Sequence, residues 1–121
     1  MENGKFQRDN PITEKSYRFA VRIVRLAQFL QQSKREFTLS RQVLKSGTSI
    51  GANIAEAQQA QSKADFISKM SVSMKETTET KYWLKLLHDT GYLNDQGFSS
   101  IIADCIEIEK LLTAILKSSK Q

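Results

Sequence analysis

The chain has 121 residues, a formal net charge of +5 and one cysteine, Cys105, so it fits a single domain and excludes an internal disulfide. No apolar run is long enough to cross a bilayer and no signal-peptide core precedes the first helix, so we expect a cytoplasmic protein without a membrane partner. One proline, five glycines and 40% hydrophobic residues favour an all-α fold over a β-sandwich or a disordered chain.

The first predicted helix covers residues 11–35. Asn10 supplies an N-cap candidate, and Pro11 fits the first helical position, where its missing N–H costs nothing. Apolar residues recur three or four positions apart along one face. On another face four cations share this spacing, and we call them the basic ridge: Lys15, Arg18, Arg22 and Arg25. The ridge belongs to the most basic part of the chain, because residues 1–38 carry eight Lys or Arg against four Asp or Glu.

Three further helices follow at short intervals. Their predicted ranges are residues 39–61, 63–90 and 95–118. Short links force neighbouring helices to be antiparallel, which predicts an up-down-up-down four-helix bundle. The last helix is apolar on more than one side, and the second presents a surface of small residues. This apolar surface exceeds what one core uses, so we expect a homo-oligomer.

The helix boundaries carry local signals. The N-cap candidates are Thr38 or Ser40 for the second helix, Ser62 with Asp65 for the third, and Asp95 for the fourth. Gly91 is expected to end the third helix, since glycine tolerates the left-handed backbone found at helix ends.

The stretch SGTSIGANIAEA, residues 46–57, is open to two interpretations. A phosphate-binding loop would require Gly-x-x-x-x-Gly-Lys-Ser/Thr or Gly-x-Gly-x-x-Gly, and neither spacing occurs here. In a helix, Gly47, Gly51 and Ala55 fall four residues apart on one ridge. Each helical glycine costs about 1 kcal/mol relative to alanine. Close packing of another helix can offset this cost, so the sequence predicts a helix–helix contact.

The third helix has an unusual polar centre. Its core face reads Phe66, Met70, Ser73, Thr77, Thr80 and Leu84, apolar at the ends and hydroxylic in the middle. A second face carries glutamates and a tryptophan that we expect to join the second helix in a polar cluster. The structural or interface residues predicted in this way are Gly47, Ser49, Gly51, Asn53, Glu56, Glu76, Glu79 and Trp83. We expect the three glutamates to pair with Lys75, Arg41 or Lys45 across helices or subunits.

Instead of forming structural ion pairs, the glutamates of this cluster could bind a metal ion or a small molecule. Di-iron bundles use Glu-x-x-His pairs, but the only histidine, His88, lies nine residues beyond Glu79. One cysteine and one histidine cannot fill a tetrahedral zinc site. Cys105 is one of a series of apolar residues spaced three or four positions apart, which favours core packing over a nucleophilic role. The sequence therefore predicts no catalytic residue, no metal and no cofactor.

The motifs in residues 46–57 and 65–84 carry a family resemblance. Ser-Gly-x-Ser-Ile-x-x-Asn-Ile-Ala-Glu, Asp-Phe and Lys-Glu-x-x-Glu-x-x-Tyr-Trp-Leu resemble the family encoded in the intervening sequences of bacterial 23S ribosomal RNA genes. The resemblance implies a four-helix protomer in a homopentamer without known catalytic activity. It also implies kinship with the accessory protein of diversity-generating retroelements, a basic pentameric barrel that associates with nucleic acid and a reverse transcriptase.

We therefore expect a non-enzymatic oligomer, either an RNA- or DNA-binding protein of low sequence specificity or a ribonucleoprotein accessory factor. The expected contacts to phosphates are the Lys and Arg side chains of the basic ridge. The alternative is a structural or adaptor oligomer that binds another protein.

Overall fold

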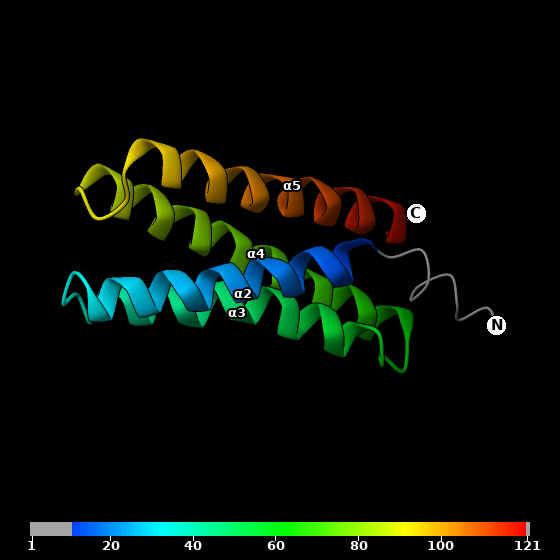
Figure 1. The fold of residues 1–121 in the computed structure, drawn as a ribbon. Helices are drawn as coiled ribbons and strands as arrows, with labels where there is room; N and C mark the ends of the chain where they lie inside the picture. The colour runs from blue at the N-terminus through cyan, green and yellow to red at the C-terminus, as the bar shows by residue number, and fades with distance from the viewer. Residues whose placement is uncertain (1–10, 121) are drawn as a thin grey trace.

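The computed structural model describes residues 11–120, most of which lie in four α-helices. They are α2 (Pro11–Gln32), α3 (Leu39–Ala57), α4 (Lys63–Asp89) and α5 (Asp95–Ser119). Successive helices run in opposite directions: the α2–α3 and α4–α5 connections lie at one end and the α3–α4 connection at the other (Figure 1). The described residues contain no strand, which confirms the predicted all-α four-helix fold.

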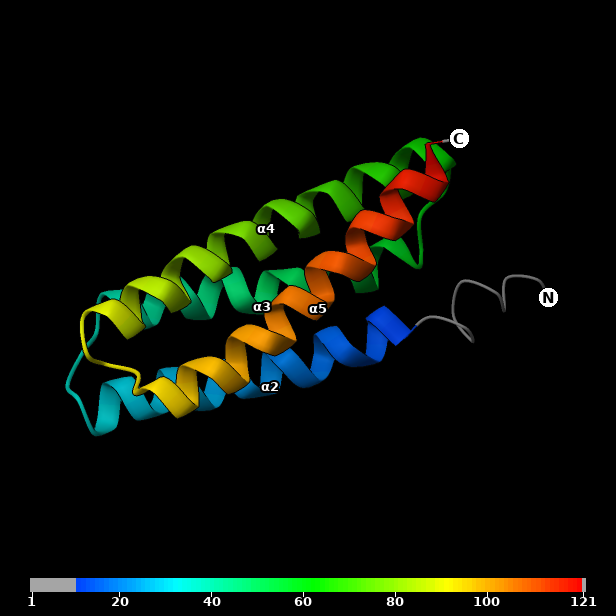
Figure 2. The ribbon, with the colours of Figure 1, turned by 90° about the horizontal axis from the view of Figure 1, so that it is seen from above.

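The four helices enclose one apolar core. The largest fully buried side chains are Ile12, Phe19, Ile23, Leu30, Val43, Ile50, Ile54, Met70, Leu84, Leu87, Ile108 and Leu112. Seen from above, α5 runs obliquely across the other helices (Figure 2). The oblique path leaves α2 with two neighbours of different character: α3 contacts it through small side chains, and α5 through charged ones.

The centre of the core is polar, as the hydroxyl-bearing face of the third helix predicted. Ser73 Oγ donates to the Ile50 carbonyl oxygen at 2.9 Å, and Thr80 Oγ1 lies 2.9 Å from Ser46 Oγ. Thr77 Oγ1 donates to the Ser73 carbonyl oxygen at 2.8 Å. Because each of these buried hydroxyls has a hydrogen-bond partner, the polar layer sets the register between α3 and α4 without leaving an unsatisfied group.

The two glycines of α3 allow α2 to approach closely. A Cβ atom at position 47 would lie 2.7 Å from Cγ2 of Ile23, and one at position 51 would lie 3.3 Å from the Ser16 carbonyl oxygen. Ala55, the third member of the predicted ridge, is exposed in the protomer. The small residues therefore serve a helix–helix contact within one chain, as the spacing of Gly47 and Gly51 predicted.

Two helices end earlier than their patterns indicate. α2 stops at Gln32 rather than residue 35, because Arg35 adopts a left-handed backbone with φ 55° and the Glu36 N–H donates to the Leu30 carbonyl oxygen. This backbone costs a non-glycine residue about 1–2 kcal/mol. α3 stops at Ala57 rather than residue 61, since the chain must reverse before the α4 cap, which is extended. Gly91, at φ 88°, follows the end of α4 as predicted.

The N-cap of α4 is confirmed: Ser62 Oγ accepts from the Asp65 N–H at 3.0 Å. The prediction for α3 is confirmed only in position. Thr38 is the N-cap residue, but its side chain makes no cap hydrogen bond, because the Glu36 carboxylate accepts the N–H groups at the start of this helix. The prediction for α5 was wrong. Asp95 is already helical, and the extended residue Asn94 caps α5 by accepting from the N–H of residue 97. The Asn10 cap lies outside the described residues.

The Gly47 contact predicts the effect of adding one methyl group. Gly47→Ala should lower the free energy of unfolding by about 1–2 kcal/mol, because overpacking against Ile23 exceeds the gain in helix propensity. Urea denaturation followed by circular dichroism measures this change. The matched control is Gly47→Ala in an Ile23→Ala background, where the added methyl group should no longer destabilise. Equal losses in both backgrounds would contradict the proposed contact.

Candidate nucleic-acid interface

The structure places most of the basic ridge in ion pairs. Lys15 Nζ lies 3.0 Å from Oε2 of Glu107, and Arg22 Nη1 lies 2.7 Å from Oδ2 of Asp104. The Arg22 guanidinium also donates to the side-chain oxygen of Ser100 at 2.9 Å. Both carboxylates belong to α5. The ridge therefore connects α2 to α5, a structural role that the sequence pattern did not predict.

The other two ridge residues face solvent. Arg18 pairs with Glu14 one turn earlier at 2.6 Å. The hydrogen bond and the charge of Arg18 lower the pKa of the Glu14 carboxyl, and Glu14 in turn raises the pKa of Arg18. Arg25 is exposed and forms no ion pair with any described residue. Of the four predicted phosphate contacts, Arg25 alone thus presents a charge that no described carboxylate balances.

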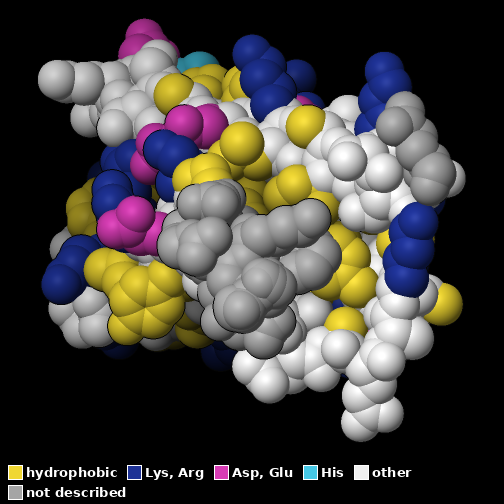
Figure 3. All heavy atoms as spheres, turned by 90° about the vertical axis from the view of Figure 1, so that its right-hand side faces the viewer, with side chains coloured by type: hydrophobic (Ala, Val, Ile, Leu, Met, Phe, Trp, Pro, Cys, Tyr) yellow, Lys and Arg dark blue, Asp and Glu magenta, His cyan; other side chains and the backbone are white. Residues whose placement is uncertain are grey.

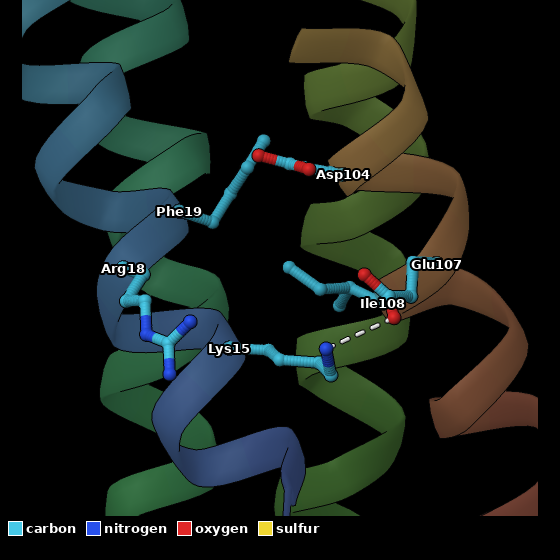
Figure 4. A pocket seen from close by; sticks show the side chains of 6 residues that line it. All are labelled: Lys15, Arg18, Phe19, Asp104, Glu107 and Ile108. Atoms are coloured by element: carbon cyan, nitrogen blue, oxygen red, sulfur yellow. Dashed lines mark ion pairs between the residues drawn. The ribbon is translucent and has the colours of Figure 1, made fainter. Parts of the chain in front are cut away.

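A pocket of ≈ 120 Å³ opens beside the ridge between α2 and α5 (Figure 4). Its lining residues are Lys15, Arg18, Phe19, Asp104, Glu107 and Ile108. Two cations and two carboxylates share this lining, and Lys15 reaches across toward Glu107 (Figure 4). A phosphate would meet repulsion from the carboxylates here, so the pocket is a poor anion site.

The glutamates predicted to gather between α3 and α4 do not converge on one site. Glu56 pairs with Lys69 at 2.8 Å, rather than with Lys75, Arg41 or Lys45. The Glu79 carboxylate accepts the indole N–H of Trp83 at 3.1 Å, and Glu76 is half-buried. No three His, Cys, Asp or Glu residues in the described part of the chain are arranged to hold a metal ion. The acidic side chains are thus distributed among separate local contacts.

Ser49 and Asn53 make contacts within α3. Ser49 Oγ donates to the Lys45 carbonyl oxygen at 2.7 Å, and Asn53 Nδ2 donates to the Ser49 carbonyl oxygen at 2.9 Å. Both side chains are only partly buried in the protomer. Their predicted role at an interface between subunits stays a prediction.

The structure reveals a second basic surface at the connection between α2 and α3. Lys34 Nζ lies 5.7 Å from the ring centroid of Phe29, and Arg35 Cζ lies 5.3 Å from that of Phe37. All four side chains are exposed. We call these four residues the turn cluster. The sequence alone could have indicated a basic surface in this region, because residues 15–55 contain eight Lys or Arg and a single carboxylate, Glu36.

Comparison with known families identifies the chain. Residues 8–114 match the family model described as "23S rRNA-intervening sequence protein". The chain belongs to this family. It is also similar to a crystal structure of a protein with unknown function from the S23 ribosomal protein family of Bacteroides thetaiotaomicron VPI-5482. The two chains are 54% identical with a TM-score of 0.88, and the match covers 90% of this chain and 97% of the other. No curated protein matches the chain.

Family membership confirms the resemblance drawn from residues 46–57 and 65–84 and agrees with the helical architecture. The similar crystal structure is of a protein with unknown function, so its likeness to this chain indicates a shared fold and no activity. None of the helices in the described range combines the length and hydrophobicity required to cross a membrane.

Cys105 is the one described thiol, and it is buried against α4. Its Sγ atom lies 3.7 Å from the Thr77 carbonyl oxygen. Burial, with a smaller contribution from the Glu109 charge, raises the pKa of this thiol to about 12. The thiolate is the nucleophilic form, so the native thiol is unreactive near neutral pH.

This raised pKa predicts slow alkylation. At pH 8, iodoacetamide should label Cys105 about a thousand-fold more slowly in the native protein than in denaturant. The reason is that the pKa of this thiol is about 12 in the folded protein and 9.0 in the unfolded chain, so far less of it is thiolate when folded. Mass spectrometry at timed intervals measures both rates. The same shift adds stability that is complete below pH 9 and is lost as the pH rises from 9 through 12. Equal labelling rates in native and denatured protein would refute the buried, protonated thiol.

Proposed function

We propose that this protein is a non-enzymatic cytosolic homo-oligomer that binds RNA or DNA with low sequence specificity. The observation that carries the proposal is the positive charge left on the surface after the internal ion pairs are formed. Phosphate contacts from Lys and Arg supply most of the affinity of such binding, and they require no particular base sequence.

The ion pairs use as many carboxylates as cations. Five pairs join a Lys or Arg to an Asp or Glu within the described chain. The exposed cations outside these pairs include Arg25, Lys34, Arg35, Arg41, Lys45, Lys75, Lys85, Lys110, Lys117 and Lys120. The remaining carboxylates include Glu36, bound to backbone N–H groups, and Asp89 and Asp95, which flank His88. The exposed surface therefore carries more free positive than free negative charge.

The nucleophile and base candidates are engaged in structural contacts, which supports a binding role rather than catalysis. His88 Nε2 lies 2.7 Å from Asp95 Oδ1, and its ring stacks on Phe98 with centroids 4.3 Å apart. No described Ser, Thr or Cys side chain hydrogen-bonds to this imidazole. The thiol of Cys105 is protonated and buried.

Exposed apolar side chains on α2 support self-association. Tyr17 is 71% exposed, and Val21 and Val24 follow it on the same helix face. Ile106 adds an exposed apolar group on α5. Burying these groups against copies of the chain would remove apolar area from water, which favours assembly. We propose five copies, the number that the family resemblance implies.

The alternative function is an adaptor that binds another protein, and α4 offers a surface for it. Tyr82 is 60% exposed and packs edge-on against Trp83 with ring centroids 5.1 Å apart. Val72 is exposed on the same helix. Tyrosine and tryptophan are frequent at protein interfaces because each combines a large apolar ring with one polar group.

The nucleic-acid proposal predicts a steep dependence on salt. For about four phosphate contacts to a single strand, affinity should fall about fifty-fold between 50 and 200 mM salt, because each contact releases counterions. Fluorescence anisotropy with a labelled oligonucleotide measures it. Arg25→Gln should weaken binding, whereas Arg22→Gln on the same helix should affect it less, since Asp104 already balances that charge. Failure to bind at 50 mM salt, with a specific protein retained in a pull-down, would favour the adaptor.

The oligomer proposal predicts a particle of about 69 kDa, five times the 13.8 kDa chain. Multi-angle light scattering should give this mass. Val21→Asp with Val24→Asp should reduce it toward the protomer, because both charges would be buried at the interface. The matched control is Lys75→Asp with Lys85→Asp on α4, a helix that contributes none of these apolar groups, and it should leave the mass unchanged. A protomer mass for the wild-type protein at micromolar concentration would overturn self-association.

A further inference from the structure

We infer that the turn cluster at the α2–α3 connection binds single-stranded nucleic acid by stacking bases on Phe29 and Phe37. This inference rests on the proposed nucleic-acid function and specifies its surface and the form of its ligand. The cluster lies at the end of the bundle that also carries the α4–α5 connection (Figure 1).

The two aromatic rings of the cluster are open to solvent. Phe29 is 43% exposed on the last turns of α2, and Phe37 is 41% exposed just before α3. Neither belongs to the buried core. An exposed phenylalanine offers a flat face to any base, and such stacking tolerates all sequences because every base has a π-face.

A cation accompanies each ring. Lys34 Nζ lies 5.7 Å from the Phe29 centroid, and Arg35 Cζ lies 5.3 Å from the Phe37 centroid. A base stacked on either ring would bring its phosphate near a positive charge. Aromatic platforms with adjacent cations are typical of surfaces that hold single strands.

The charge around the cluster is not balanced locally. Glu36 is the only carboxylate between Glu14 and Glu56, and its oxygens accept the N–H groups of Thr38, Leu39 and Ser40 at 3.2, 2.9 and 2.8 Å. Its negative charge is therefore directed at the helix terminus. Two more exposed cations follow on α3, Arg41 and Lys45.

The acidic side chains of the adjacent connection have their own partner. Asp89 and Asp95 approach the two nitrogens of His88 at 3.4 and 2.7 Å. They are therefore not paired with the cations of the turn cluster.

The backbone of the turn supports a role for the Arg35 side chain. Its φ of 55° lies in the left-handed region, where glycine would be the less strained residue. The guanidinium makes no ion pair with a described carboxylate, so folding gives no compensating salt bridge. Strained positions of this kind gather at functional sites.

The opposite end of the molecule differs. Figure 3 shows acidic, basic and apolar side chains close together on that face. The mixed charge of that visible surface makes it a weaker match for a polyanion than the turn cluster. Duplexes are also a poor match for the cluster, because their bases are already stacked on one another.

The test is anisotropy with a labelled U-rich 16-nucleotide single strand, as RNA and as DNA, and with the corresponding duplex. Phe29→Leu with Phe37→Leu keeps apolar groups but removes the flat rings, so single-strand affinity should fall about ten-fold or more with an unchanged salt slope. Lys34→Gln with Arg35→Gly should lower the salt slope by about 1.4, since two phosphate contacts are lost. The strand, RNA or DNA, that the wild-type protein binds more tightly is the preferred ligand.

Lys110→Gln with Lys117→Gln, two exposed cations of α5, is the matched control and should change binding less than the turn variants. Wild-type binding that the turn variants leave unchanged would overturn this inference while the nucleic-acid function stands. Duplex binding as tight as single-strand binding would overturn it as well. Absence of wild-type binding at 50 mM salt would overturn the proposed function and this inference together.

Discussion

The close approach of α2 to α3 is the contact on which the rest of the bundle depends. Gly47 lets the Ile23 side chain rest on the α3 backbone, and Gly51 admits the α2 backbone at Ser16. A methyl group at either position would push the helices apart, since protein interiors are close-packed and the nearest atoms have little room to move. With α2 held in this orientation, its core stripe faces inward, and Lys15 and Arg22 of the basic ridge reach α5.

That orientation has a consequence for the charge on the molecule. Lys15 and Arg22 meet carboxylates of α5, so the part of the ridge next to α5 holds two helices together. Such half-exposed pairs contribute little to stability, about 0–1 kcal/mol each, but they neutralise charge at their position. The unbalanced cations of the α2–α3 hairpin are left farther along, at Arg25 and at the turn. The candidate interface in the tertiary structure therefore lies at the end of the first helix, whereas the sequence pattern had placed it along the middle of that helix.

The polar layer in the core acts together with the glycine contact. Ser46 and Ser73 place hydroxyls between α3 and α4 where an all-apolar core would allow sliding. The two contacts that cross between the helices, Ser73 with the Ile50 carbonyl oxygen and Thr80 with Ser46, form only in one register, because a hydrogen bond requires a specific distance and angle. Glycine contacts set the separation of α2 and α3, and hydroxyl contacts set the alignment of α3 and α4.

The sequence by itself determined the helices, their order and the family. Apolar residues three or four apart, short links and Gly91 are local signals, and the motif around Gly47 is specific enough to recognise. Helix ends and cap hydrogen bonds were harder to predict. Thr38 is the N-cap residue of α3, but the Glu36 carboxylate from the preceding turn, rather than the Thr38 side chain, accepts the free N–H groups. A cap four residues away depends on the path of the turn, which the sequence pattern does not show.

Only the tertiary structure decided which charges are free. Lys15, Arg22 and Arg25 share one sequence pattern, yet two are paired with α5 and one is exposed. The glutamates of α3 and α4 share helix faces but do not meet. Whether the Arg22 charge is balanced depends on Asp104, 82 residues away along the chain, and only packing brings the two together. Periodicity therefore predicted the faces of each helix, while the partners across those faces came from the fold.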